Sequence, residues 1–391
     1  MTRSEHWSSI LARLAGMVPL LILLVTAPAA QAQTFTVLHS FTGPEGTNPY
    51  SGLIMDHAGR LYGTAYAGGA HGFGTVYRIA RAGSGWIATG LYSFQGGMDG
   101  AYPAASVAFG PDGTLYGTTA GGGSGGNEYG TVFNLRPPAS VCKAALCPWT
   151  ETVLHRFSGG SDGATPDYAD ALVFDQGGNI YGTTASGGAH GYGVVFELTH
   201  SGGIWTENVL WSFTGGDDGG SPTSGVIFDS AGNLYGTGVS GGAHGDGVVY
   251  ELSPSESGWT QTTLYSFSGA DAPFPAGGVT MDANGNLYGT TGGPQGQGEA
   301  YELTQTSGNW SISRRQILSV SYNGPYDTPT LDAEGNLYGT SSFFGAGCGE
   351  VFKMTPFRRW RAYRRRSCGR FRADRSRASR VGKSAAVSPW C

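Results

Sequence analysis

The chain has 391 residues, of which 68 are glycine, 12% are aromatic and 13% are charged, with a formal net charge of −5. This combination of glycine and aromatic residues excludes a disordered linker and predicts an all-β body. Residues 33–356 carry nine Lys and Arg against 26 Asp and Glu, a net charge of −17. Such an acidic body excludes nucleic acid as a partner, because phosphate binding needs Lys and Arg.

The N-terminus has the pattern of a signal peptide. Arg3 and Arg13 precede an apolar run over residues 14–25, and an A-x-A cleavage sequence ends at Ala32. An uncleaved membrane anchor is the alternative, but the run is short for a span and Pro19 interrupts it. We therefore predict a signal peptide over residues 1–32, a secreted or cell-surface protein, and no transmembrane span after cleavage.

A phrase of the form L-Y-G-T, once I-Y-G-T, recurs six times along the body. Its tyrosines are 54, 65, 54, 53 and 50 residues apart: Tyr62, Tyr116, Tyr181, Tyr235, Tyr288 and Tyr338. A period near 50 residues marks a repeat architecture, and each unit is long enough for a four-stranded propeller blade. In the fourth and most regular unit we predict strands over residues 225–229, 234–237, 247–252 and 262–267.

The fourth strand of the repeat is shifted relative to the other three. It follows units one to five, is missing after unit six, and has an extra copy over residues 36–41. We therefore predict a monomeric six-bladed β-propeller of four-stranded blades over residues 33–356. The N-terminal strand would close the ring by pairing with residues 350–354, which removes exposed sheet edges. An open β-solenoid is the alternative.

One long insertion, which explains the 65-residue spacing, contains Cys142 and Cys147. In an oxidising compartment these cysteines could close a small loop disulfide. A metal pair is the alternative, but no second His/Cys pair accompanies it.

Four sequence blocks recur in order: G-N-L-Y-G-T-T, G-G-x-x-G-x-G-x-V-F-E-L, W-x-x-x-x-L-Y-S-F and G-G-x-D-G-x-x-P. This pattern resembles the tandem repeat of bacterial choice-of-anchor surface proteins of the Gloeobacter/Verrucomicrobia type, over residues 34–356. The resemblance implies export and retention at the cell surface by C-terminal sorting signals. It implies no defined activity, so no catalytic residue is carried over from it.

The C-terminal segment departs from that pattern. Residues 357–391 carry twelve Lys and Arg and one Asp, a net charge of +11, and show no strand alternation. We predict a disordered tail. A basic arm for polyanions or the cell envelope is one interpretation. A one-base frameshift is the other, because shifted codons for residues 357–360 could read Ser-Gly-Gly-Gly, the turn also found at residues 201–203.

In a propeller with this strand order, the links between blades and the loops joining second to third strands share one face. Eight side chains are our candidates for a ligand-binding site on this face: His71, His190, His244, Asp99, Asp162, Asp217, Asp218 and Asp246. Aromatic residues join them at Tyr50, Tyr102, Tyr168, Phe274 and Tyr326. Carboxylates, imidazoles and aromatic rings together suit a glycan or Ca²⁺. The alternative for each acid is turn formation, since Asp before Gly commonly stabilises turns.

No nucleophile elbow, zinc-protease, phosphate-loop or dinucleotide motif occurs in the sequence. We therefore predict an exported surface binding, adhesion or scaffold module whose partner is a glycan or a cell-envelope component. No cofactor is evident apart from the Ca²⁺ considered above. The alternative is a secreted hydrolase or lyase acting on polysaccharide with acids from several blades. Non-repeated acid, His or Tyr residues gathered at one place would favour the enzyme.

Overall fold

The computed structural model describes residues 36–124, 127–138, 149–166, 171–269, 273–292, 298–318, 328–341 and 350–355. The chain divides into two compact units, Met1–Ser40 and Phe41–Cys391. Three predictions lie outside the described residues: the signal peptide, the pairing of Cys142 with Cys147, and the disordered tail over residues 357–391. Across the described ranges, no helix combines the length and apolarity that a membrane crossing requires.

The second unit is an all-β propeller of six blades, as predicted, and five of its sheets have four described antiparallel strands. The first blade contains β1 (Ile54–Met55), β2 (Leu61–Ala65), β3 (Thr75–Ala82) and β4 (Gly85–Ser93). The second contains β5 (Ala108–Phe109), β6 (Leu115–Thr119), β9 (Thr131–Arg136) and β10 (Thr150–Arg156), with a small extra hairpin of β7 (Gly123–Ser124) and β8 (Asn127–Glu128). The third contains β11 (Val173–Phe174), β12 (Ile180–Thr184), β13 (Val194–Ser201) and β14 (Ile204–Ser212).

The fourth blade contains β15 (Ile227–Phe228), β16 (Leu234–Gly238), β17 (Val248–Ser255) and β18 (Gly258–Ser266). The fifth contains β19 (Thr280–Met281), β20 (Leu287–Thr291), β21 (Gly298–Thr306) and β22 (Asn309–Leu318). The sixth has three described strands, β23 (Thr330–Leu331), β24 (Leu337–Ser341) and β25 (Glu350–Met354). A short 3-10 helix, η1 (Gly97–Asp99), lies in the link after the first blade.

The outer hairpin of the fourth blade, β17 and β18, is longer than predicted. The first strand of the same blade, β15, is shorter than the predicted range of residues 225–229. The ladder between β17 and β18 continues past a bulge at Val249 and Tyr250 to the pair Ser255 and Gly258. A bulge adds a residue to one strand without ending the pairing. The turn between these strands is therefore only two residues long in the structure, shorter than predicted.

Closure by the N-terminal strand stays a prediction, because residues 36–41 carry no strand assignment. Phe41 nevertheless contacts Tyr77 of β3 edge-on, with ring centroids 4.8 Å apart. The phenylalanines directly after the fourth strands contact the third-strand ring of the following blade in the same way, with centroids 5.1–5.3 Å apart: Phe94, Phe157, Phe213 and Phe267. Phe41 thus fills the place of a fourth-strand phenylalanine ahead of the first blade.

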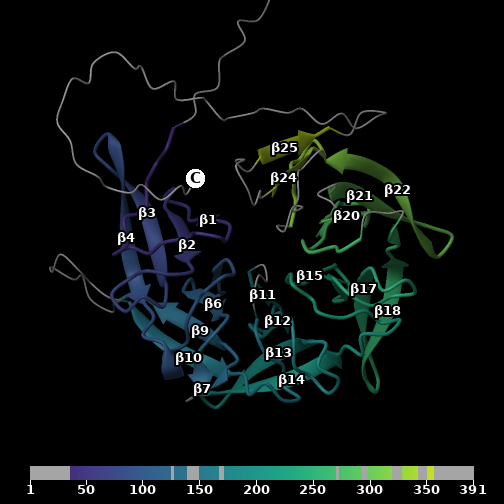
Figure 1. Cartoon of the computed structure of the whole chain (residues 1–391), viewed down its shortest axis with the longest axis horizontal. Helices are drawn as coiled ribbons and strands as arrows, with labels where there is room; N and C mark the ends of the chain where they lie inside the picture. The colour runs from purple at the N-terminus through teal and green to yellow at the C-terminus, as the bar shows by residue number, and fades with distance from the viewer. Residues whose placement is uncertain are drawn as a thin grey trace, which may run out of the picture. The chain divides into compact units, whose positions relative to one another are not determined.

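Within this unit the sheets follow one another in an arc, with short first strands such as β1 on the inner side and long fourth strands such as β14 on the outer side (Figure 1). The hydrophobic core lies between neighbouring blades. One cluster joins Leu91 and Phe94 of the first blade to Leu115 and Phe133 of the second, and similar clusters fill the next joints. Each blade is therefore stabilised mainly by burial against its neighbours.

The recurring L-Y-G-T phrase is explained by packing and turn formation. A Cβ added at Gly236 would lie 2.6 Å from the Tyr250 ring, so the glycine leaves room for the third-strand aromatic. The Tyr235 hydroxyl donates to Asp229 in the preceding hairpin turn, at 3.2 Å. That carboxylate also accepts the backbone N–H groups of Ala231 and Asn233. All six units contain this Asp–Tyr contact, so these aspartates form hairpin turns.

Five links in the described part of the chain contain a strained residue directly before a proline. These residues have φ between 50° and 68°: Asn48, Tyr102, Thr165, Ser221 and Phe274. Positive φ is costly for a residue other than glycine, so the surroundings must enforce it. The Ser221 N–H donates to the Tyr192 carbonyl at 2.7 Å, and the Ser221 carbonyl accepts from Val239. These bonds join each link to the loops of two successive blades, which forms the shared face that the sequence predicts.

Candidate functional site

Three of the candidate acids close turns within the links. Asp99, Asp162 and Asp218 each accept the backbone N–H of the residue four positions earlier, at 2.8–3.0 Å. The hydroxyls of Ser158 and Thr214 also donate to Asp162 and Asp218 respectively. The contacts of these acids therefore favour turn formation over a ligand-binding role.

The same three acids contact one position of the preceding fourth strand. Asp99 accepts from the Tyr92 hydroxyl at 2.9 Å, and Asp218 accepts from the Trp211 indole N–H at 3.1 Å. His155 Nε2 lies 3.6 Å from Asp162, beyond hydrogen-bond distance. Burial lowers the pKa of His155, although Asp162 opposes this shift. The acid thus ties each link to the outer strand from which it emerges.

Replacing Asp218 with alanine should lower the free energy of unfolding by about 2–3 kcal/mol. The change removes the acceptor for the Thr214 N–H, the Thr214 hydroxyl and the Trp211 indole. The neighbouring Asp217 is exposed, so Asp217→Ala is a matched control that should change stability by less than about 0.5 kcal/mol. Urea unfolding followed by tryptophan fluorescence measures both. Equal effects of the two substitutions would contradict the turn assignment.

The three candidate histidines are exposed and occupy one repeat position in separate blades: His71, His190 and His244. Among the residues that the structure describes, no group of three or more His, Cys, Asp or Glu side chains is placed to hold a metal ion. The candidate face is therefore formed, but no convergent metal-ligand set is found within its described part. Among the predicted aromatics, Tyr168 and Tyr326 lie outside the described residues.

Asp246 occupies a position of the second-to-third-strand loops that is aromatic in the first three blades. The first three blades place Phe73, Tyr129 and Tyr192 there, packed over a glycine of the following link. The Asp246 carbonyl keeps the backbone role of this position, since it accepts the Phe274 N–H at 2.9 Å. Asp246 thus preserves the joint while replacing the aromatic side chain with a carboxylate.

A cluster of tyrosines lies on the same face in the first blade. Tyr66 and Tyr102 are stacked, with centroids 5.1 Å apart and an interplanar angle of 24°. Tyr50 is tilted against Tyr66 at 5.6 Å, and Phe73 meets Tyr102 edge-on at 5.8 Å. Tyr50 is 60% exposed, so the cluster presents a ring to solvent. The sequence prediction included Tyr50 and Tyr102 but missed Tyr66, whose signal is a tyrosine where other units have Ala, Val, Gly or Ser.

Two partly buried glutamates were not predicted. Burial and the nearby Asp99 raise the pKa of Glu151 to about 7, with Arg156 opposing. Burial and Asp162 raise the pKa of Glu207 to about 7. The sequence signal is a repeated W-T-E at residues 149–151 and 205–207, which becomes W-T-Q at residues 259–261. Gln261 donates to the Asp218 carbonyl at 3.1 Å, so this position contacts the preceding link.

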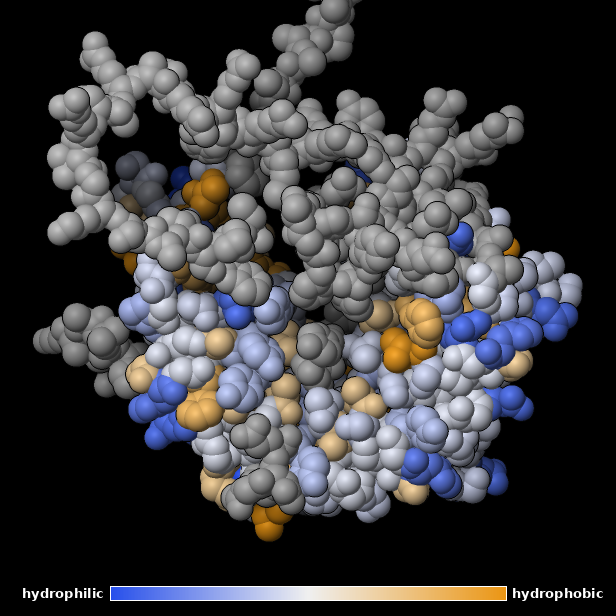
Figure 2. Space-filling view, in the orientation of Figure 1, coloured by the Kyte–Doolittle hydropathy of each residue, from blue (hydrophilic) through white to orange (hydrophobic). Residues whose placement is uncertain are grey.

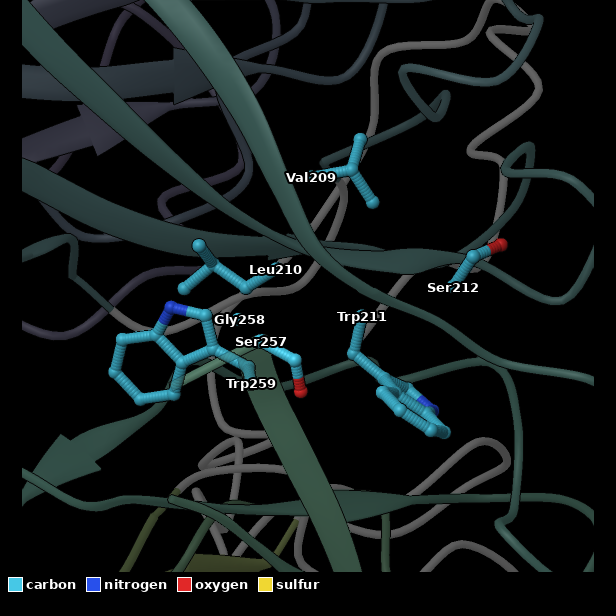
Figure 3. A pocket seen from close by; sticks show the side chains of 7 residues that line it. All are labelled: Val209, Leu210, Trp211, Ser212, Ser257, Gly258 and Trp259. Carbon is cyan, nitrogen blue, oxygen red and sulfur yellow. The ribbon is translucent and has the colours of Figure 1, made fainter. Parts of the chain in front are cut away.

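A pocket of about 340 Å³ lies between β14 and the turn that joins β17 to β18. Its lining includes Trp211, Trp259, Leu210 and Ser257 (Figure 3). Leu210 and both tryptophans pack against the core between the third and fourth blades, and the Trp211 indole N–H is bonded to Asp218. These contacts give the lining residues a structural role.

The family model of the Gloeobacter/Verrucomicrobia repeat matches residues 25–169 and 141–352. The chain belongs to this repeat family. The match covers most of the propeller and agrees with the resemblance carried by the four sequence blocks. No curated protein matches the sequence.

Three solved structures show a distant likeness. One is described as an oxidoreductase (glucose dehydrogenase) from Thermus thermophilus, at 14% identity and TM-score 0.45, covering 80% of this chain and 97% of that one. A polysaccharide lyase of family PL25, an ulvan lyase, has 12% identity and TM-score 0.48, covering 82% and 86%. A protein of unknown function from Dyadobacter fermentans has 11% identity and TM-score 0.45, covering 82% and 94%. At these values the likenesses do not bear on this chain's activity.

Proposed function

We propose that this chain is an exported, non-catalytic β-propeller that binds a glycan of the cell envelope or its surroundings. The ligand would bind on the face formed by the interblade links and the second-to-third-strand loops. The signal-peptide pattern supports export, and the repeat family supports a scaffold of tandem units.

The observation that carries this proposal is a contrast between acids and aromatics on that face. Asp99, Asp162 and Asp218 have the same turn-forming contacts in three successive links. Tyrosines instead gather at one place, in the first blade and the links on either side of it, in a combination that no other described unit repeats. A repeat protein that binds one ligand at one place needs residues there that the other units lack. In this chain, those residues are a combination of aromatic side chains. Aromatic rings with few polar groups are typical of ligand-binding sites.

A thermal-shift screen of the exported full-length chain tests the proposal. The panel contains neutral and acidic oligosaccharides and CaCl₂, each measured with and without EDTA. We expect at least one glycan to raise the Tm, because a ligand that binds only the folded state must stabilise it. EDTA should leave that shift unchanged. A cooperative transition that no glycan moves would contradict glycan binding.

The alternative function is a polysaccharide-acting enzyme, and one observation favours it. Glu207 has a pKa raised to about 7 and lies near Asp162, as a general acid near a second carboxylate would. The arrangement is duplicated at Glu151 and Asp99, however, and is replaced by Gln261 in the next blade. Duplication and replacement along the repeat fit a joint between blades better than a single active site.

A further inference from the structure

We propose that Tyr50, supported by Tyr66 and Tyr102, is a stacking platform for an uncharged sugar ring. This inference rests on the proposed glycan-binding function and adds both the position of the site and the chemical class of the ligand. Its basis is the geometry of the first blade and of the links on either side of it.

The three tyrosines come from separate segments, and it is their combination that departs from the repeat. Where Tyr50 follows the link proline, the five interblade links have Ala104, Asp167, Thr223, Ala276 and Tyr326. Where Tyr66 follows the second strand, the other units have Ala120, Ala185, Val239, Gly292 and Ser342. Tyr102 has one aromatic counterpart among the described residues, Phe274. The residue that corresponds to Tyr66 in that unit is Val239, which is not aromatic. Only in the first blade, among the described residues, do aromatics fill all three positions together.

Backbone hydrogen bonds fix the platform in place. The Tyr66 N–H donates to the Asn48 carbonyl at 3.0 Å, two residues before Tyr50. The Tyr102 N–H donates to the Phe73 carbonyl at 2.8 Å, and its own carbonyl accepts from Ala120 at 3.1 Å. Tyr102 is held at φ 59° by these contacts. A preorganised platform reduces the entropy lost when a ligand binds.

The exposed ring suits the C–H face of a sugar, while its hydroxyl can bond to a sugar hydroxyl. Tyrosine combines an apolar ring with a polar end and loses little conformational entropy on binding. The rings of Tyr50, Tyr66, Tyr102 and Phe73 are uncharged, and the body around them has a net charge of −17. An acidic polysaccharide would meet like charge as it approached. The ligand is therefore an uncharged glycan.

Isothermal titration calorimetry with the exported full-length chain tests this site. The probes are cellohexaose, xylohexaose, mannohexaose and chitohexaose, with hexagalacturonate as the acidic counterpart. We expect at least one neutral hexasaccharide to bind, Tyr50→Ala to weaken that binding about tenfold, and Tyr50→Phe to retain most of it. Tyr192→Ala is the matched control, because Tyr192 is 44% exposed on the same face but belongs to the third blade. Its affinity should stay within about twofold of the parent.

The outcomes separate this inference from the proposed function. If neutral hexasaccharides bind and Tyr50→Ala binds them as well as the parent does, the platform is wrong and the function stands. If only hexagalacturonate binds, the proposal that the ligand is an uncharged glycan is wrong. If the folded parent binds none of the five probes, both proposals are contradicted. Thermal melts of each variant establish that a loss of binding is not a loss of fold.

Discussion

Replacing Gly236 with alanine should lower the free energy of unfolding by about 2–3 kcal/mol. A Cβ at this position would lie 2.6 Å from Cζ of Tyr250 and would also contact its hydroxyl. Tyr250 is fully buried between the third and fourth blades, so it cannot swing into solvent to relieve the clash. Overpacking in a close-packed core forces side chains off their preferred rotamers or shifts the backbone.

The matched control is Gly90→Ala in β4. Gly90 has ordinary φ, and an added Cβ would meet its nearest neighbours at 3.9 Å, an ordinary contact distance. Removing a glycine from a strand also reduces the entropy of the unfolded chain, so this variant should be neutral or slightly more stable. Chemical unfolding of both variants measures the difference. A Gly236→Ala protein as stable as Gly90→Ala would show that the glycine of L-Y-G-T is not required for packing.

Replacing Glu207 with glutamine should stabilise the protein by about 1–2 kcal/mol at pH 8 and leave its stability at pH 4 nearly unchanged. The native pKa of Glu207 is about 7, above its ordinary value of 4.5, because burial and Asp162 favour the protonated form. Between these two values the native state holds a proton that the unfolded state has released. Stability from this group therefore falls as pH rises through that window, and the full penalty remains above it. Partial exposure to solvent keeps the effect below the full value of the shift.

The same reasoning applies to Glu151, which faces Asp99 and Arg156. One oxygen of each glutamate is buried without a hydrogen-bond partner among the described residues. Gln261 is the chain's own neutral version of this position. His155 contributes in the opposite direction just below its ordinary pKa, since burial favours its neutral form, so the difference between parent and variant is the quantity to compare.

Unfolding free energies at pH 4, 6 and 8 for the parent, Glu151→Gln, Glu207→Gln and Glu256→Gln check this prediction. Glu256 is exposed in the turn between β17 and β18, and its substitution removes the same formal charge without relieving burial. That substitution should be nearly neutral at every pH. Two results would contradict a link between burial and protonation of Glu151 and Glu207. One is the same stabilisation by their substitutions at pH 4 and pH 8, and the other is the same stabilisation by Glu256→Gln.

Much of the fold could be predicted from the sequence because the repeat imposes a single strand order. The spacing of the L-Y-G-T tyrosines sets the six units, and the fourth-strand copy over residues 36–41 suggests closure. Phe41 packs as that copy predicts, although the strand itself is not assigned. The ends of the outer hairpin were predicted less well, since the bulge at Val249 and Tyr250 has no clear sequence signal.

The candidate site was harder to predict, because the sequence alone does not distinguish an acid that forms a turn from one that binds a ligand. Asp217 and Asp218 are adjacent acidic residues of one glycine-rich link, and it is the Asp218 carboxylate that accepts from Thr214 and Trp211. Conversely, Tyr66 is a single tyrosine in a second-to-third-strand loop, between two repeated blocks, and it belongs to neither of them. Its stacking on Tyr102, which is 36 residues later in the chain, depends on how a link returns to the preceding loop.

On the surface in view, hydrophobic residues are scattered in small patches over a mainly hydrophilic or neutral background (Figure 2). Large exposed patches are the usual mark of a protein-binding surface. Scattered apolar residues of this kind need no partner protein. The view is therefore compatible with a ligand bound through a small group of aromatic side chains rather than through a broad apolar interface.

Hydrogen–deuterium exchange of the full-length chain, with and without a neutral hexasaccharide found to bind in the titration, tests the position of the ligand most directly. Our proposal predicts slower exchange in residues 47–50, 65–69 and 101–103, which hold the three tyrosines. It predicts no change in residues 186–192 and 240–246, which carry His190 and His244 on the same face. Protection of those histidine loops, with no change in the first blade, would contradict the proposal.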